Sequence, residues 1–322
     1  MPDQKLYVVS HAPYWHNGSS IRAKSYDYML AALPAVLMGI SQYGVAAFRV
    51  VAFSVSCAVL WELLLNKVMK RPITIVDGNA AVIGLLLAMM LPAAAPWWAV
   101  LVGTLAAILV GKWVYGGIGC NPLNPVMVAF AMLLLSWKGV VDFNAALVNF
   151  DLGFAMPYPP ASLKYFGAAA VEDFTVWQLL MGRQTGGIGT TFGLGLIAGG
   201  LYLILRGHVR WEIPASFVAG ILITAFLFQV SDPDKYGAPI FHLLTGSTLL
   251  AAFFLIGEDS SSPVNRTPMF IYGALGGFLT VLIRSIGIYP DGVVFAVLLI
   301  NIFNPLLDKI RPKAFGKGAQ DA

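Results

Sequence analysis

The sequence predicts an all-α integral membrane protein with about ten transmembrane helices, arranged as two inverted five-helix repeats. Its composition, its apolar runs and a repeated glycine spacing support this fold class. Hydrophobic residues make up 58% of the 322 residues and charged residues 11%, whereas soluble domains carry about 25% charged residues. The mean hydropathy is +0.76. These values exclude a soluble globular protein.

The predicted helices are apolar runs that end at charged or turn-forming clusters. A membrane-spanning helix needs about 20 mostly apolar residues. By this criterion the runs are 28–43, 45–66, 78–95, 97–115, 122–137, 189–206, 211–230, 243–257, 268–286 and 291–308. Short runs such as 78–95, 122–137 and 243–257 indicate broken helices around a midplane site, and ordinary helices with imprecise ends are the alternative.

The distribution of basic residues predicts the orientation. With the N-terminus inside, fourteen of the 20 Lys and Arg residues fall on the inner side, which places both termini in the cytoplasm. The predicted organisation is a leader (1–27), a first repeat (28–137), an extracytoplasmic loop (138–188), a second repeat (189–308) and a basic tail (309–322). The leader lacks the apolar core of a cleavable signal peptide, so we expect the first run to stay in the membrane.

Similar strings in the two halves indicate duplication. Val102-Gly103-Thr104-Leu105 leads to Gly117 and Tyr272-Gly273-Ala274-Leu275 leads to Gly287, and the separation between the two glycines is fourteen positions in both cases. Asp77-Gly78 and Thr245-Gly246 open two of the short runs. Gly78 and Gly246 are 168 positions apart, close to the 170 positions between Gly103 and Gly273. Repeating five spans inverts the second half and places a ligand where the halves meet. Chance similarity between Gly-rich helices is the alternative.

Charge and cysteine content exclude several functions. The net charge is +4, but the basic residues are dispersed between apolar runs, so we expect no nucleic-acid binding. Cys57 and Cys120 are too few for a disulfide framework or an Fe-S cluster. The four histidines lack metal-ligand spacing, and we expect no metal site. A redox role therefore requires an organic cofactor or a partner.

The string from Gly116 to Pro125 is the most distinctive candidate site. Gly117 and Gly119 allow positive φ and close approach of a ligand, while Asn121 and Asn124 add amide donors and acceptors next to helix starts. A tight turn between helices, with capping asparagines, is the structural alternative. The concentration of glycine, asparagine and proline residues in this short string favours a ligand site.

Carboxylates near the predicted inner boundary are further candidates. Asp77, followed by Gly78, and Glu258 fall on the same side, where they either cap helices or hold a cation or ligand. Glu62 lies inside the second run. Its position five residues before Lys67 favours snorkelling to the interface, and a place along an ion path is the alternative.

The end of the outer loop is a candidate anion site. Glycines lead into a helix start beside a basic residue, an arrangement typical of phosphate binding, with Arg183, Thr185, Thr190 and Thr191 as candidates. The string is not a Walker A loop, and no dinucleotide-binding fingerprint is present.

These strings together resemble one family. The chain resembles RnfD of the Rnf electron-transport complex, and more weakly NqrB of the sodium-translocating NADH:quinone reductase. The resemblance is carried by the segment Asp77–Ala88, the string Gly116-Gly117-x-Gly119-x-Asn121-x-x-Asn124-Pro125, Leu243–Gly246 and Tyr289–Val293. The resemblance spans nearly the whole chain. It implies a urea-transporter-like fold and a flavin-carrying component of a complex in a bacterial inner membrane, with FMN, a possible riboflavin, and Thr245 and Gly246 among the flavin-facing residues.

The resemblance also implies partners and a reaction. The expected partners are flavoprotein and Fe-S membrane subunits, together with soluble subunits that react with NADH and ferredoxin. Electron transfer between ferredoxin and NAD(H) would be coupled to movement of Na⁺ or H⁺, so the chain would be part of a translocase and not catalytic alone. A small-solute transporter and a cofactor-free anchor subunit are the alternatives.

One motif departs from the family. FMN is usually attached through its phosphate to a Thr in an outer-loop motif that begins with Asp. Here the corresponding string has Met156 at the Asp position, Pro159 at an inner Ser/Thr position and Ser162 as the acceptor. We therefore expect noncovalent FMN, with a phosphoester on Ser162 as the less favoured variant.

Overall fold

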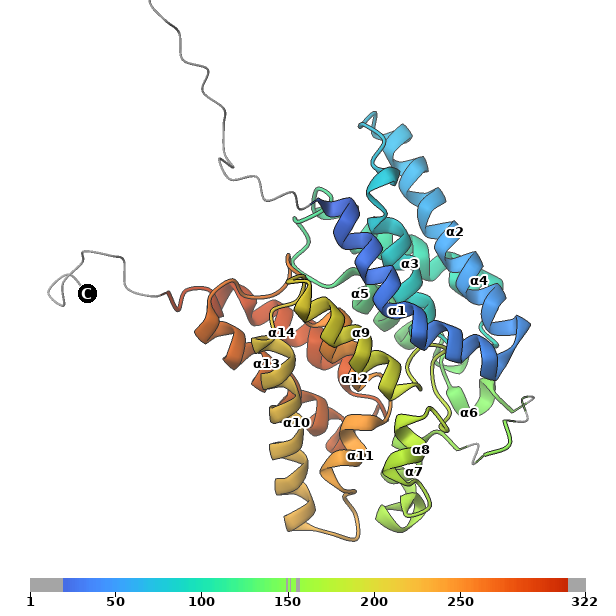
Figure 1. Ribbon diagram of the computed structural model, residues 1–322, viewed down its shortest axis with the longest axis vertical. Coiled ribbons are helices and arrows are strands. Elements are labelled where there is room, and N and C mark those ends of the chain that lie inside the picture. Colours follow the sequence, from blue (N-terminus) through green and yellow to red (C-terminus); the bar gives the residue numbers. More distant parts are fainter. Residues whose placement is uncertain (1–19, 149, 151, 155–156, 312–322) are drawn as a thin grey trace, which may run out of the picture.

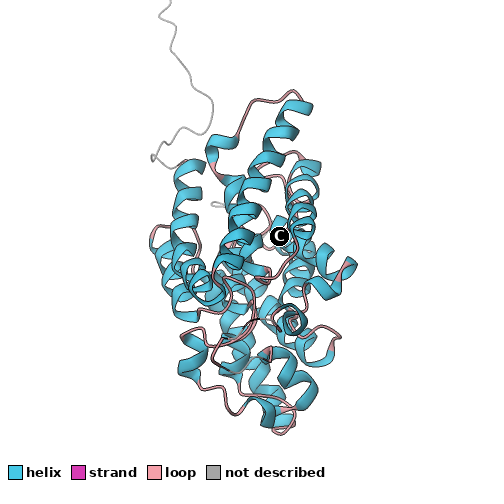
Figure 2. Ribbon diagram, turned by 90° about the vertical axis from the view of Figure 1, so that its right-hand side faces the viewer, coloured by secondary structure: helices cyan, strands magenta, loops and turns pink. Residues whose placement is uncertain are grey.

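The computed structural model describes residues 20–148, 150, 152–154 and 157–311. Met156, the predicted leader up to residue 19 and the tail from residue 312 lie outside the described residues. Figure 2 shows helices and loops throughout the described part, with no strand. The predicted all-helical fold class is confirmed at this level.

The first half contains five main helices, in agreement with the first five apolar runs. They are α1 (Ile21–Tyr43), α2 (Val45–Val68), α3 (Asn79–Met90), α4 (Trp97–Leu105) and α5 (Pro125–Ser136). Local sequence determines several of their ends. Ser20 accepts a hydrogen bond from the Ala23 N–H at the start of α1, and Asn124 caps α5 ahead of a proline at the first helical position.

The predicted outer loop folds into short helices, and five more helical runs follow it. The loop contains α6 (Phe143–Ala146), α7 (Pro159–Phe166) and α8 (Val176–Leu180). The second half contains α9 (Gly193–Leu205), α10 (Glu212–Ser231), α11 (Pro239–Leu244), α12 (Thr248–Leu250), α13 (Arg266–Ile286) and α14 (Val293–Leu307). Within the described part of the chain, four helical stretches are long and apolar enough to span a membrane, namely those at 45–68, 97–115, 212–231 and 266–286.

The short runs are broken or short helices, as one of the two interpretations predicts. α3 and α5 have 12 residues each, about 18 Å of helix, which is well below the roughly 30 Å of a bilayer core. The run 243–257 is interrupted at Thr245–Ser247, between α11 and α12. These interruptions leave backbone N–H and C=O groups without intrahelical hydrogen-bond partners inside the helical body.

The two halves share some local features. Gly78 and Gly246, the paired glycines of the predicted repeat, both adopt left-handed conformations, with φ of 72° and 70°. Gly117 has φ of 114°, whereas its predicted counterpart Gly287 is extended. Each half also contains a π-helical turn that begins with two alanines, at Ala106–Val110 and Ala251–Leu255. The full inverted-repeat layout stays a prediction.

Small residues allow the helices to pack closely. A β-carbon on Gly277 would lie 2.3 Å from the Phe217 carbonyl oxygen, which fixes the contact of α13 with α10. A β-carbon on Gly199 would lie 2.1 Å from the Ala31 carbonyl oxygen, so α9 of the second half lies directly against α1 of the first (Figure 1). Such contacts between small residues are typical of membrane helices.

Candidate cofactor sites

Two pockets occupy opposite ends of the helical body. The one we call the outer pocket collects segments predicted outside the membrane and has about 830 Å³ of space that opens partly to solvent. Its lining includes Met90, Phe130, Leu134, Lys138, Asp142, Asn144, Tyr158, Ala161, Tyr165, Thr190, Ser247, Tyr289 and Asp291.

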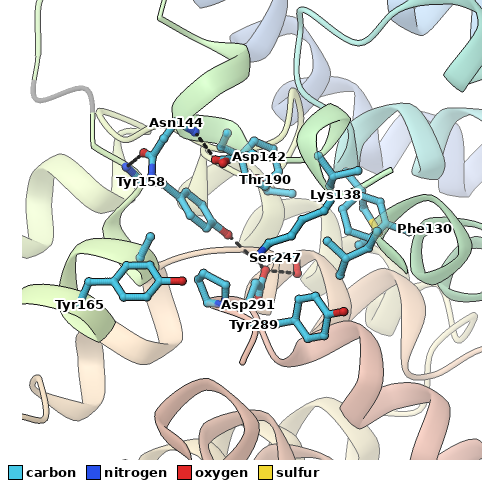
Figure 3. Close-up of a pocket in the computed structure, with 16 residues that line it drawn as sticks. Phe130, Lys138, Asp142, Asn144, Tyr158, Tyr165, Thr190, Ser247, Tyr289 and Asp291 are labelled. Carbon is cyan, nitrogen blue, oxygen red and sulfur yellow. Dashed lines mark hydrogen bonds between the residues drawn. The ribbon is translucent and has the colours of Figure 1, made fainter. Parts of the chain in front are cut away.

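Asp291 is the polar centre of the outer pocket (Figure 3). Its Oδ2 accepts hydrogen bonds from the Ser247 N–H at 2.8 Å, the Ser247 hydroxyl at 2.6 Å and the Tyr158 hydroxyl at 3.4 Å. Its Oδ1 lies 3.0 Å from Arg284 Nη2, and this guanidinium is almost fully buried. The carboxylate is thus held in place by the turn before α12, by Tyr158 at the start of α7 and by Arg284 of α13.

Thr245 and Gly246 form the turn that places these groups. Thr245 donates to the Phe241 carbonyl at 2.7 Å at the end of α11, and Gly246 then reverses the chain with positive φ. A β-carbon on Gly246 would lie 2.9 Å from Asp291 Oδ2. Glycine is therefore required here both by backbone conformation and by the closeness of the carboxylate.

Aromatic rings provide flat walls. Phe143 and Tyr158 lie with ring centroids 4.8 Å apart and an interplanar angle of 39°, and Tyr165 and Tyr289 complete the lining. Figure 3 shows the Lys138 and Tyr158 side chains pointing toward Ser247 and Asp291. The pocket therefore combines aromatic surfaces with one ammonium group, that of Lys138, and two carboxylates, those of Asp142 and Asp291.

Ser162 lies beside this pocket on α7. Its hydroxyl donates to the Tyr158 carbonyl at 3.3 Å, and the side chain is buried. Ser162 lines a shallower pocket together with Ala161 and Tyr165, which also line the outer pocket. The position that matches the usual flavin-attachment Thr is thus next to the outer pocket.

The predicted phosphate-binding residues at the end of the outer loop separate in the structure. Thr190 lines the outer pocket and donates to the Gly187 carbonyl. Thr185 donates to the Pro157 carbonyl at 3.1 Å, while Thr191 donates to Gln42 Oε1 at 3.3 Å. Arg183 is exposed and lines neither large pocket. Lys138 is the ammonium group that the outer pocket contains.

The second pocket, which we call the inner pocket, gathers segments predicted on the inner side and has about 920 Å³ of partly open space. Its lining includes Lys24, Tyr28, Asn79, Val82, Ile83, Leu86, Lys112, Ile118, Gly119, Asn121, Asn124, Val126, Glu258 and Ser260. The predicted Gly/Asn string and the predicted carboxylate region therefore meet at one site.

Asn121 and Glu258 join the two halves at the inner pocket. The Asn121 amide donates to Glu258 Oε1 at 2.8 Å, and Ser261 donates to Oε2 at 3.2 Å. Burial raises the pKa of the Glu258 carboxyl to about 7, against the opposing effect of these hydrogen bonds. Glu258 is thus able to exchange a proton near neutral pH at the wall of the pocket.

The other inner candidates have structural roles close to the pocket. Asp77 accepts a hydrogen bond from the Asn79 N–H at 2.9 Å and so caps α3. Gly78 supplies the left-handed turn before that helix. Asn124 caps α5 and also donates to the Leu255 carbonyl at 2.9 Å, which ties α5 to the second half. Gly117 lies in the turn before the pocket-lining Gly119.

Glu62 does not snorkel, so that interpretation is wrong. Its carboxylate is almost fully buried, with Lys112 Nζ at 2.9 Å, Trp113 Nε1 at 3.0 Å and the Thr74 hydroxyl at 2.9 Å. The residue faces the protein because a buried lysine from a separate part of the first half offers a full charge partner. Spacing to Lys67 could not reveal this long-range contact.

Comparison with known proteins identifies the family. The family model described as NQR2, RnfD, RnfE matches residues 8–316. The chain belongs to this family. Two proteins from Escherichia coli O7:K1 (strain IAI39 / ExPEC) and O127:H6 (strain E2348/69 / EPEC), each named as a subunit of an ion-translocating oxidoreductase complex, are 32% identical to it, over 97% of this chain and 99% of theirs. The counterpart from Escherichia coli O81 (strain ED1a) is 31% identical over the same shares. The resemblance found from the motifs is confirmed.

In this NQR2, RnfD, RnfE family member, three of the four strings that carried the resemblance line the two pockets, and the fourth ends at Gly246, next to the pocket-lining Ser247. The Gly/Asn string lines the inner pocket, and the segment around Tyr289 and Asp291 lines the outer one. Sequence reasoning missed Asp291 and Arg284 as site residues. The available signal was an arginine within an apolar run, since an ionisable residue inside a membrane segment is itself a functional hypothesis.

Proposed function

We propose that this chain is the flavin-carrying membrane subunit of an Rnf-type electron-transport complex. In this proposal it passes electrons across the membrane between ferredoxin and NAD(H), coupled to translocation of Na⁺ or H⁺. The relatives are named as subunits of an ion-translocating oxidoreductase complex, which supports assembly with other subunits. The observation that carries the proposal is the pair of pockets, each lined by apolar and polar side chains, toward opposite ends of the same helices.

The spacing of the pockets suits electron transfer. On α3, Leu86 lines the inner pocket and Met90 the outer one, and on α5 the corresponding residues are Val126 and Phe130. Four helical residues span about 6 Å along an axis. Two redox groups in these pockets would therefore be separated by little more than a layer of side chains.

That layer is packed and apolar. Leu87, Met89 and Met127 are fully buried between the two ends. A close-packed layer blocks solutes, whereas electrons tunnel through it when donor and acceptor are near. The packing therefore favours an electron carrier over the alternative of a small-solute transporter. An anchor subunit without cofactor gives no reason for two such pockets.

In this proposal the outer pocket holds FMN. An isoalloxazine ring requires flat apolar walls and a few placed polar groups, which Tyr158, Tyr165 and Asp291 supply. Lys138 and Thr190 would hold the phosphate, and no covalent bond is needed. The hydroxyl of Ser162 already donates to a backbone carbonyl beside the pocket. When bound, FMN supplies one-electron chemistry, while this chain positions the ring and sets its electrostatic surroundings.

In this proposal the inner pocket holds a second flavin without a phosphate, such as riboflavin. Asn79 and Asn121 offer amide contacts, Ile83 and Leu86 offer apolar surface, and Glu258 offers a proton at the wall. The proposal includes the urea-transporter-like inverted repeat, a bacterial inner membrane with both termini cytoplasmic, and partner subunits that react with NADH and ferredoxin.

Absorption and fluorescence of the purified chain test this function. Yellow protein that releases its flavin on acid precipitation, with a dark band on a denaturing gel under ultraviolet light, is the expected result. A fluorescent band would mean covalent attachment and would point to Ser162. Colourless protein from cells that also express the partner subunits would overturn the flavin proposal and restore the transporter and anchor alternatives.

A further inference from the structure

A second, smaller cavity lies behind the outer pocket, between α7, α11 and α13. Its polar lining comes from Lys164, Lys235, His242, Arg284 and Ser285, and we call it the rear cavity. The residues of α7 that line it lie on the helix face opposite Ala161 and Tyr165, so α7 separates the rear cavity from the outer pocket. The rear cavity has room for a water-sized particle.

Unpartnered polar atoms concentrate at this cavity. Of the seven buried side-chain nitrogen and oxygen atoms that lack a hydrogen-bond partner in the described part of the chain, four belong to its lining. They are both ring nitrogens of His242, Nε of Arg284 and Oγ of Ser285. His242 and Arg284 are only 1% and 2% exposed. Buried polar groups are normally paired, so these atoms require a bound species.

The charge of the lining selects the kind of species. Among the described residues, three cationic side chains line the rear cavity and no carboxylate does. Arg284 pairs with Asp291, which lines the outer pocket and not the rear cavity. Lys164 donates to the backbone carbonyls of Arg284, Gly287 and Tyr289, while the ammonium group of Lys235 lies over the Tyr236 ring. The excess positive charge favours an anion over a cation.

We propose that the rear cavity binds a halide-sized monovalent anion. The Nε–H of Arg284, the hydroxyl of Ser285 and a ring N–H of His242 donate to it. Lys164 and Lys235 contribute charge from the outer face, which is also the side from which the anion enters. Larger oxyanions such as phosphate esters exceed the available space.

Arg284 connects this anion to the outer pocket. The same guanidinium lines the rear cavity and hydrogen-bonds Asp291 in the outer pocket at 3.0 Å. An anion behind Arg284 therefore reduces the positive potential at the outer pocket and lowers the reduction potential of a flavin held there. This consequence depends on the proposed function, but anion binding itself does not.

Thermal unfolding of the purified full chain in detergent tests the binding. Replacing sodium gluconate with sodium chloride or bromide at constant ionic strength is expected to raise Tm in a saturable way. Ser285→Ala and Lys235→Gln should each increase the halide concentration for half-maximal effect by about tenfold, as loss of a charge-assisted contact predicts. Lys67→Gln, an equal charge change at an exposed residue of α2, serves as the matched control and should leave it unchanged.

Bromide-soaked crystals locate the anion directly through anomalous scattering. A peak between Arg284 and Ser285 is expected. Three results would overturn the proposal and show that the rear cavity holds water. They are an equal Tm in halide and gluconate, a halide effect of the same size in all variants, and bromide peaks that all lie outside the rear cavity. Neither measurement needs flavin. Bromide binding by a colourless chain would therefore support the anion site and contradict only the electron-carrier function.

Discussion

Individual residues in the membrane part of this chain depend on exact charge pairing, as Glu62 shows. Glu62→Gln leaves Lys112 buried without a carboxylate, and removal of one partner of a buried pair costs about 3–5 kcal/mol. We expect a large fall in Tm, measured by intrinsic fluorescence in detergent. The double variant Glu62→Gln/Lys112→Met should recover a substantial part of the loss. Equal stability of the single variant and wild type would show that the pair is not required.

The glycine before α12 supports a second prediction. Gly246→Ala places a side chain at φ of 70° and 2.9 Å from Asp291 Oδ2, so it combines backbone strain of about 1–2 kcal/mol with displacement of the carboxylate. Gly207→Ala is the matched control, since Gly207 has a similar positive φ of 74° but no atom within 4 Å of the added carbon. We expect Gly246→Ala to lose more stability and more bound flavin, measured by Tm and by flavin content. Equal effects of the two changes would contradict the role assigned to Asp291.

Glu258 gives the stability of the protein a pH dependence. Because burial raises its pKa from 4.5 to about 7, the folded state retains a proton between these values that the unfolded chain has released. This contribution to stability is present below about pH 4.5, falls as pH rises to about 7 and is constant above that. Glu258→Gln stays neutral, so relative to this variant the wild type should lose about 1–3 kcal/mol between about pH 5 and pH 8. Parallel Tm curves of the two proteins over that range would refute this assignment.

At the scale of elements, most helices were predicted from apolar runs and from the Gly, Pro and charged residues that bound them. The short runs correctly indicated α3, α5 and the interruption between α11 and α12, because Gly and Pro signals are local. The Glu62–Lys112 and Arg284–Asp291 pairs could not be predicted as contacts, since each depends on how separate helices pack. The dispersal of Thr185, Thr190 and Thr191 to different partners likewise depends on the path of the loop between the halves.

Helix packing gives an element-scale prediction. Gly277→Val inserts a branched side chain where a β-carbon already meets the Phe217 carbonyl oxygen at 2.3 Å, so α13 must move away from α10. We expect a loss of about 1–3 kcal/mol or more, typical of overpacking, seen as a lower Tm and faster proteolysis. Leu275→Val on the exposed face of α13 is the control and should have little effect. Unchanged stability of Gly277→Val would contradict the close contact.

For the whole molecule, the arrangement places one pocket at each end of α3 and α5, with a packed apolar layer between them. The sequence indicated the inner site through its Gly/Asn string and the outer one through the family's attachment motif. It did not show that both sites share the same two helices, because that follows from packing of the halves. Shared helices allow the two ends to be close while remaining separately accessible.

Under the proposed function, this arrangement predicts that the two proposed flavins can be removed independently. Tyr165 lines only pockets on the outer side and Ile118 only the inner pocket, and both are partly exposed, so truncation should leave the fold intact. Tyr165→Ala should lower FMN content several-fold through lost ring contact, and Ile118→Ala should lower riboflavin content through lost apolar contact. Chromatography of acid extracts measures both flavins, and each variant is the control for the other. Parallel loss of both flavins in either variant would mean that the pockets form one coupled site.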